Sequence, residues 1–234
     1  MDYADKNILA IDSTSLTLKL ALRFGTDRIV KSIERTGMSH GPVIIKKIED
    51  LLKAAALDCR ALHAIVASIG PGSFTGLRIG LATAKGLAVA LDIPVVGVSL
   101  FDLAELKLTG RKGHRLLIVP FKRDTYFVAA FEDDLCNQSH IKVVTKEQLN
   151  DILNNDSVAY IGFEDTEAVP LPKGRPVPEV LNYDAADLIR LGMERLSQGR
   201  IPDLAELEPL YLQKSQAEIR FAQRKRKQGP ASGH

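Results

Sequence analysis

A glycine-rich segment between an apolar strand and a helix constrains this chain more than any other feature. The segment VASIGPGSFTGLRIG, residues 66–80, contains four glycines, at positions 70, 72, 76 and 80. A strand that passes through glycines into a helix is typical of phosphate-binding loops, because the first backbone N–H groups of a helix have no partner inside it. The first question is therefore whether this turn binds an anion or is needed for packing.

Neither of the two common nucleotide-binding patterns fits the segment. A Walker A loop needs a lysine directly after its second conserved glycine, but Gly76 is followed by Leu77. A dinucleotide-binding fingerprint needs GxGxxG, whereas the stretch from Gly70 to Gly76 is one residue too long. A weaker anion site at the helix start stays open, and its candidate residues are Gly72, Ser73 and Thr75.

The helix predicted from about Thr75 to Leu91 carries two ridges of small residues spaced four apart. One ridge is Gly76, Gly80 and Ala84, and the other is Ala82, Gly86 and Ala90. A glycine inside a helix costs about 1 kcal/mol relative to alanine, so these positions indicate that something approaches the helix backbone closely. That neighbour is either another element of the same domain or a partner subunit, and the pattern leaves both alternatives open.

Strands and helices alternate on both sides of the glycine turn. A β-hairpin is predicted in NILAIDSTSLTLKLALRFG, a further strand near Ile29–Ile33 and a helix that begins near His40 with Pro42 in its first turn. The remaining predicted elements are the strands HAIVASIG and PVVGVS, two strands in LLIVPFKRDTYFVAAFEDD and a helix from about Tyr183 to Gln198. Strand, helix and strand at this spacing predict an α/β layer fold, with a lobe boundary near residues 105–115.

Composition places the chain among ordinary globular proteins. Its 234 residues are 45% hydrophobic and 26% charged, which is the usual balance of a folded domain. The acidic, polar N-terminus predicts no secretory signal, and the longest apolar helical stretch, GLRIGLATAKGLAVAL, carries Arg78 and Lys85, so we expect a cytoplasmic protein without a membrane span. Cys59 and Cys136 lack the spacing of a disulfide framework or zinc site and are expected to be free thiols.

Positive charge gathers at the C-terminus. The last 22 residues hold six basic side chains and one acid, a net charge of +5 within a chain whose total is +2. Such a cluster contacts an RNA backbone or is simply a solvated terminus. The candidate tRNA contacts are Arg224, Lys225, Arg226 and Lys227.

Three segments resemble a known family. ILAIDSTSLTLKLAL, SIGPGSFTGLRIGLATAKGLAVALDIPVVGVSLFDLAEL and EPLYLQKSQAE are similar to the TsaB (YeaZ) proteins, the non-catalytic subunits of the bacterial complex that forms threonylcarbamoyladenosine on tRNA. The likeness is close over the first hundred residues and loose beyond them. It implies a two-lobed actin-like/Hsp70-like ATPase (ribonuclease H-like) fold with mixed β-sheets flanked by helices. The first lobe would span residues 1–108 with the partner-binding helices, and the second residues 109–234 with a C-terminal helix and basic tail, whose last segment could pack back on the first lobe.

The resemblance also places a phosphate loop at the hairpin turn. Asp12, Ser13 and Thr14 are the positions that would face phosphate oxygens in relatives that bind nucleotide, and the alternative is that they merely close the hairpin. In relatives the second lobe opens with an Asp-Ala-Arg-x-Gly-Glu turn, but the corresponding stretch here, residues 120–125, reads PFKRDT and lacks both the carboxylate and the glycine. Lys122 or Arg123 is either a phosphate contact or exposed charge. We therefore expect no tightly bound cofactor, with ATP or ADP held only at an interface within the complex.

A metal site is not expected. The catalytic sister subunit, TsaD, carries two metal-binding histidines four residues apart, whereas His40 is followed four residues later by Ile44. One histidine cannot hold iron or zinc without other ligands, so His40 is predicted to be a helix-start residue or an interface hydrogen-bond donor. The sequence likewise contains no HExxH pattern and no Ser-His-Asp order, which argues against a metalloprotease.

The resemblance implies a scaffold and activator that pairs with TsaD, cooperates with the ATPase TsaE, contacts tRNA mainly through the complex and forms a homodimer in isolation. The partner surface would lie on the helices at 41–56 and 75–91. Its predicted residues are His40, Ile44, Ile48, Leu51, Leu77, Gly80, Leu81 and Ala84. The alternative function is a small-metabolite kinase of the actin-like superfold with Asp12 in a working ATP site; a metal-dependent peptidase is a third possibility that no ligand set supports.

Overall fold

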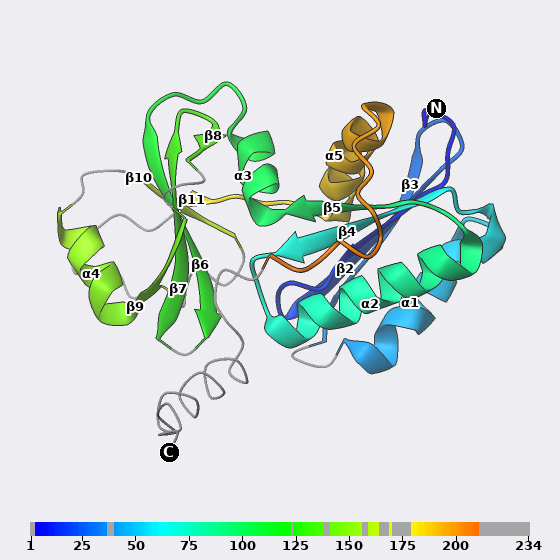
Figure 1. Cartoon of the computed structure of the whole chain (residues 1–234), viewed down its shortest axis with the longest axis horizontal. Helices are drawn as coiled ribbons and strands as arrows, with labels where there is room; N and C mark the ends of the chain where they lie inside the picture. Colours follow the sequence, from blue (N-terminus) through cyan, green and yellow to red (C-terminus); the bar gives the residue numbers. More distant parts are fainter. Residues whose placement is uncertain are drawn as a thin grey trace, which may run out of the picture.

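A computed structural model of the chain describes residues 3–36, 40–122, 124–137, 141–155, 159–163, 169 and 179–210. These residues form two mixed β-sheets with helices on their faces (Figure 1), which confirms the predicted fold class. The first sheet has the strand order β3-β2-β1-β4-β5. Its strands are β1 (Ile8–Asp12), β2 (Thr17–Phe24), β3 (Arg28–Arg35), β4 (Ala64–Gly70) and β5 (Val95–Ser99).

The strands β1, β2, β4 and β5 of the first sheet are buried on both faces, whereas the edge strand β3 is largely exposed. Leu9 and Ile11 of β1 point toward α1 (Gly41–Ala54) and α2 (Phe74–Leu91). Ile8 and Ala10 point to the opposite core, which holds α3 (Leu100–Leu108) and α5 (Ala185–Ser197). The predicted hairpin is confirmed, since β1 and β2 pair antiparallel with Asp12 directly opposite Lys19.

Local signals explain where the helices begin and end. Pro42 occupies the first turn of α1, where its missing N–H group has no partner to lose. The Ser73 side chain caps α2 by accepting from the Gly76 amide, and α2 ends at Asp92, whose φ of 55° stops the helix. A capping box between Asp184 and Asp187 starts α5.

The second sheet has the order β11-β10-β6-β7-β8, with β9 paired to β7. Its strands are β6 (His114–Lys122), β7 (Thr125–Glu132), β8 (Leu135–Cys136), β9 (Lys142–Thr145), β10 (Ala159–Gly162) and β11 (Glu179–Val180). Helix α4 (Lys146–Asn155) covers one face, where the Tyr160 hydroxyl donates to the Leu153 carbonyl oxygen at 3.2 Å. The other face shares a continuous core with the α5 side of the first sheet.

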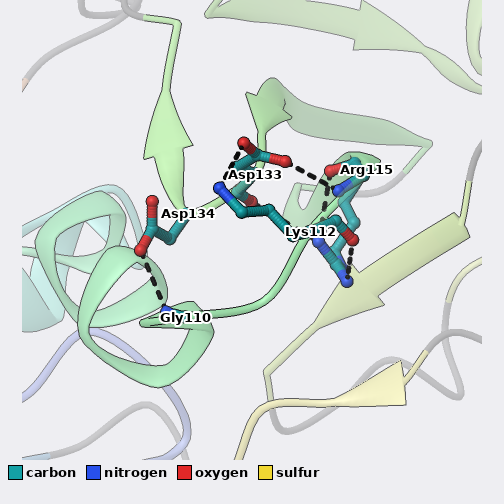
Figure 2. A network of polar contacts seen from close by, with 6 residues as sticks. Gly110, Lys112, Arg115, Asp133 and Asp134 are labelled. Atoms are coloured by element: carbon teal, nitrogen blue, oxygen red, sulfur yellow. Dashed lines mark hydrogen bonds and ion pairs between the residues drawn. The ribbon is translucent and has the colours of Figure 1, made fainter.

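Two chain segments join the sheets. The first runs from α3 into β6 and is fixed to the turn between β7 and β8 by the contacts in Figure 2. The Gly110 amide donates to Asp134 at 3.0 Å, and Lys112 pairs with Asp133 at 3.0 Å. The second runs from β11 back to α5, which lies on the first sheet (Figure 1). The C-terminal helix of the described chain therefore belongs spatially with the N-terminal strands.

Sequence patterns missed the shorter elements. Helix α3 was not predicted, although its Ser99-x-x-Asp102 capping box is visible in the sequence. Helix α4 and the strands β8 to β11 are two to ten residues long, too short for reliable periodicity. Among the described residues, α2 is the one helix long and apolar enough to cross a membrane, and a third of it is buried in the first lobe.

Candidate functional site

The turn after β1 is the centre of the candidate site, because Asp12 there is fully buried and held by three hydrogen bonds. One carboxylate oxygen, Oδ1, accepts from the Thr14 amide at 3.0 Å and from the Thr14 hydroxyl at 2.7 Å. The other, Oδ2, accepts from the Tyr183 hydroxyl at 2.6 Å. A buried carboxylate needs such donors to offset its lost hydration, so these contacts hold Asp12 in one position.

The same turn is bonded to the start of α2. The Ser13 hydroxyl donates to the Gly76 carbonyl oxygen at 2.8 Å, and the Ser73 amide donates to the Thr14 carbonyl oxygen at 2.7 Å. The structure thus brings together Asp12, Ser13, Thr14, Gly72 and Ser73 of the predicted phosphate site, while Thr75 is exposed on the first turn of α2. Their role in binding a nucleotide stays a prediction. Among the second-lobe candidates, Arg123 lies outside the described residues, and so does the side chain of Lys122.

Gly76 and Gly80 of the first small-residue ridge on α2, together with Gly72 just before the helix, leave room for this turn. A Cβ atom at Gly72 would lie 2.4 Å from the Thr14 carbonyl oxygen, one at Gly76 would lie 2.0 Å from the Ser13 carbonyl oxygen, and one at Gly80 would lie 2.1 Å from the Ser13 hydroxyl. Of the two alternatives for this ridge, the structure therefore selects a neighbour inside the same lobe. The second ridge differs, since Ala82, Gly86 and Ala90 are exposed and no atom lies within 4 Å of a Cβ placed at Gly86.

His40 is a second attachment of the turn. It is buried at the N-cap position of α1, with Nε2 2.9 Å from the Ser15 carbonyl oxygen and Nδ1 2.5 Å from the Thr36 hydroxyl. A carbonyl oxygen only accepts, so Nε2 carries a proton. His40 thus lies at the helix start as predicted, both of its ring nitrogens bond within the chain, and its role as an interface donor stays a prediction. The described residues contain no group of three His, Cys, Asp or Glu side chains that could hold a metal ion.

The side chains predicted for partner contact need correction. Ile44, Ile48, Leu51, Leu77, Gly80, Leu81 and Ala84 are buried in this chain, where they form the core between the helices and the first sheet. Periodicity finds the apolar stripe of a helix, and a stripe that packs on its own sheet looks the same in sequence as one that binds a partner. Whether α1 and α2 bind a partner stays a prediction, but other side chains would have to make the contact.

The exposed face of α2 offers a surface for such a contact. The small residues Ala82, Gly86 and Ala90 lie there beside Val89, which is 72% exposed, and Ile45 of α1 is 50% exposed. Arg78 stacks on Phe74 at 3.9 Å from the ring centroid. Helix α2 carries no acidic side chain, so Arg78 and Lys85 give it a net positive charge. We call the exposed residues of α1 and α2 the outer helix face.

Two residues of the candidate site escaped the sequence reasoning. Lys19 is 1% exposed and lies directly opposite Asp12 on β2, and its Nζ atom is 3.6 Å from the ring centroid of Tyr183. A lysine at an inward position of an alternating strand was a signal for Lys19, whereas nothing in the sequence pointed to Tyr183. The predicted tRNA contacts, Arg224, Lys225, Arg226 and Lys227, lie outside the described residues.

Comparisons with known proteins find relatives in the synthesis of threonylcarbamoyladenosine on tRNA. A family model described as TsaD, tRNA N6-adenosine threonylcarbamoyltransferase, matches residues 34–114. The tRNA threonylcarbamoyladenosine biosynthesis protein TsaB of Escherichia coli is 24% identical over 222 residues, which is 90% of this chain and 96% of the relative. TsaB of Bacillus subtilis is 38% identical over 104 residues, so this match covers only 44% of that relative's length. The solved structure of YeaZ from Pseudomonas aeruginosa is 25% identical with a TM-score of 0.69, over 88% of this chain and 100% of that one.

Proposed function

Because the chain belongs to the TsaB (YeaZ) family, we propose that it is a subunit in the synthesis of threonylcarbamoyladenosine on tRNA. The observation that carries this proposal is the likeness to Escherichia coli TsaB along nearly the whole of both chains. A shared module inside an unrelated protein would match over one segment only. The structural likeness to YeaZ likewise extends over both lobes.

Within that synthesis we assign the chain a non-catalytic role as scaffold and activator. The polar groups of the candidate site support this role, because Asp12, Ser13 and Thr14 all bond to atoms of the same chain. A catalytic acid, base or nucleophile must instead reach a substrate atom at hydrogen-bond distance. Nucleotide would bind weakly here and more readily at an interface formed in the complex.

The partner we propose is TsaD, bound at the outer helix face. The α2 part of this face consists of small apolar residues and Val89, and α2 also carries Arg78 and Lys85, so this part fits a helical surface with an acidic border. An uncovered apolar helix face of this kind favours association, and in isolation a second copy of the chain would cover it. TsaE and tRNA would join through the assembled complex.

Co-purification with TsaD from the same organism, followed by tRNA modification with and without this chain, tests the proposal. We expect a stable complex and stimulated modification. Val89→Glu should abolish both, because it places a charge in the apolar contact. Leu135→Glu is the matched control, since Leu135 is 68% exposed but lies on the second sheet. Modification that needs no added chain would overturn the function, and equal binding by the two variants would overturn the assigned surface.

A separate assay addresses the kinase alternative. The isolated chain should show no phosphotransfer from magnesium-ATP to small metabolites, because the Asp12 carboxylate is held by Thr14 and Tyr183. Sustained phosphotransfer that Asp12→Asn removes would favour the kinase over the scaffold.

A further inference from the structure

Tyr183 connects the two lobes through contacts on three sides. It lies where the chain crosses from β11 to α5 (Figure 1). Its ring meets Phe163 edge-on, with centroids 5.1 Å apart and an interplanar angle of 76°, and Phe163 directly follows β10 of the second sheet. Its hydroxyl bonds to Asp12 of the first sheet, and Lys19 lies over its ring. One side chain therefore touches both lobes.

The residue next to Tyr183 fixes this crossing to the first lobe. Asp184 pairs with Lys31 of β3 at 2.6 Å and caps α5 by accepting from the Ala186 amide at 2.7 Å. The residue that follows Tyr183 is therefore bonded both to β3 and to the first turn of α5.

The contacts continue from Asp12 to the helices of the outer helix face. Asp12 holds Thr14, the Thr14 carbonyl oxygen accepts from Ser73, and Ser13 bonds to Gly76 at the first turn of α2. The Ser15 carbonyl oxygen contacts His40 at the start of α1. The turn packs directly against Gly72, Gly76 and Gly80, where no side chain separates the two segments. A displacement of the turn must therefore displace the start of α2 as well.

We propose that Tyr183 is an interlobe latch that sets the position of the Asp12–Ser15 turn and, through it, the starts of α1 and α2. The relative placement of the two lobes then regulates binding at the outer helix face. The partner half of this inference rests on the proposed function, whereas the coupling inside the chain does not. Tyr183 is a positioning residue that acts through Asp12.

Amide hydrogen exchange in the isolated chain tests the internal coupling. Tyr183→Phe removes the hydroxyl and keeps the ring, so the fold is retained while Asp12 loses a donor. Exchange of residues 73–80 should become about tenfold faster, because a hydrogen bond to a buried charge has at least that effect on local opening. Tyr160→Phe is the matched control, since the Tyr160 hydroxyl donates to the Leu153 carbonyl oxygen in the second lobe. Unchanged exchange at 73–80 in Tyr183→Phe, or an equal change in Tyr160→Phe, would overturn the latch.

A double-mutant cycle locates the coupling in the turn. Ser13→Ala removes the bond to Gly76, so its effect on exchange should fall short of additivity with Tyr183→Phe, since both break the same path. Strict additivity would contradict transmission through Ser13. Thr109→Ala is the control for hydroxyl removal, because the Thr109 side chain bonds back to α3 carbonyl oxygens.

The affinity for TsaD tests the second part of the proposal, which is that the placement of the lobes regulates binding at the outer helix face. The dissociation constant of the TsaD complex should rise about tenfold in Tyr183→Phe and stay unchanged in Tyr160→Phe. If the wild-type chain binds no TsaD at all, the proposed function fails while the exchange result still decides the latch. If exchange increases but the dissociation constant is unchanged, the latch stands and its control of binding is overturned.

Discussion

The Ser13 hydroxyl donates a hydrogen bond to the Gly76 carbonyl oxygen at 2.8 Å, although the two residues lie 63 positions apart. This contact joins the turn after the first strand to the first turn of α2. It is possible because Gly76 has no side chain, and it explains why a helix that would be more stable with alanine carries glycine here.

The two glycine ridges of α2 should respond oppositely to alanine. In Gly76→Ala the new Cβ would lie 2.0 Å from the Ser13 carbonyl oxygen, so we expect the free energy of unfolding to fall by about 1–3 kcal/mol. In Gly86→Ala the new Cβ meets no atom within 4 Å, so the free energy of unfolding should rise by about 0.5–1 kcal/mol. Urea denaturation measures both. A loss in Gly86→Ala as large as in Gly76→Ala would contradict the packing described.

Arg195 should stabilise the placement of α5 on the first lobe. Its guanidinium donates to the Gly97 carbonyl oxygen of β5 and pairs with Asp102 of α3 at 2.6 Å. Arg195→Met keeps the apolar stem and should lower the free energy of unfolding by about 1.5–3 kcal/mol.

Arg200→Met is the control for Arg195→Met, because Arg200 is 60% exposed and lies 4.0 Å from Glu194. Its effect should stay within about 0.5 kcal/mol. Thermal denaturation measures the stability of both variants. An equal loss of stability in Arg195→Met and Arg200→Met would mean that the Arg195 contacts do not stabilise α5.

The two cysteines should differ in reactivity. Burial, with the Glu105 and Asp102 carboxylates adding to it, raises the pKa of the Cys136 thiol to about 12, whereas Cys59 is exposed. Because the thiolate is the reactive form, iodoacetamide at mildly alkaline pH should label Cys59 and leave Cys136 unmodified. Mass spectrometry should show one label on the native chain, two after unfolding and none on native Cys59→Ser. Rapid labelling of Cys136 in the native chain would contradict the raised pKa of its thiol.

Acid should weaken the contact between Lys31 and Asp184. Burial opposes ionisation of Asp184, but the Lys31 ammonium and the Ala186 amide outweigh it and hold the Asp184 pKa below its ordinary value of 3.8. A carboxyl group with a depressed folded-state pKa stabilises the native state above the unfolded pKa, and this stabilisation is lost as pH falls through the folded pKa.

The Asp184→Asn variant isolates that contribution. Near neutral pH it should be less stable than the wild type by about 0.5–1 kcal/mol, and the difference should shrink as pH falls through the depressed folded-state pKa of Asp184. Urea denaturation across this pH range gives both curves. A difference that is constant down to the lowest pH would assign the loss to capping geometry instead of charge.

Prediction from sequence succeeded where the determining contacts are local. The hairpin turn at Asp12, the helix that follows Ser73 and the stop before Pro94 depend on residues a few positions apart, so pattern and capping chemistry were sufficient. It failed for Tyr183, whose hydroxyl meets Asp12 from 171 positions away. It also failed for the helix stripes of α1 and α2, whose apolar residues cover the chain's own sheet.

The sequence by itself determined an α/β chain with its main strands and helices, the resemblance to one family and the fact that something approaches the backbone of α2. Only the tertiary structure decided what that neighbour is. Spacing and side-chain size record that room is needed on a helix, but they do not record which distant segment fills it. The fold brings the Ser13 turn onto Gly76 and leaves Gly86 exposed, so one ridge is part of the lobe and the other is available for contact.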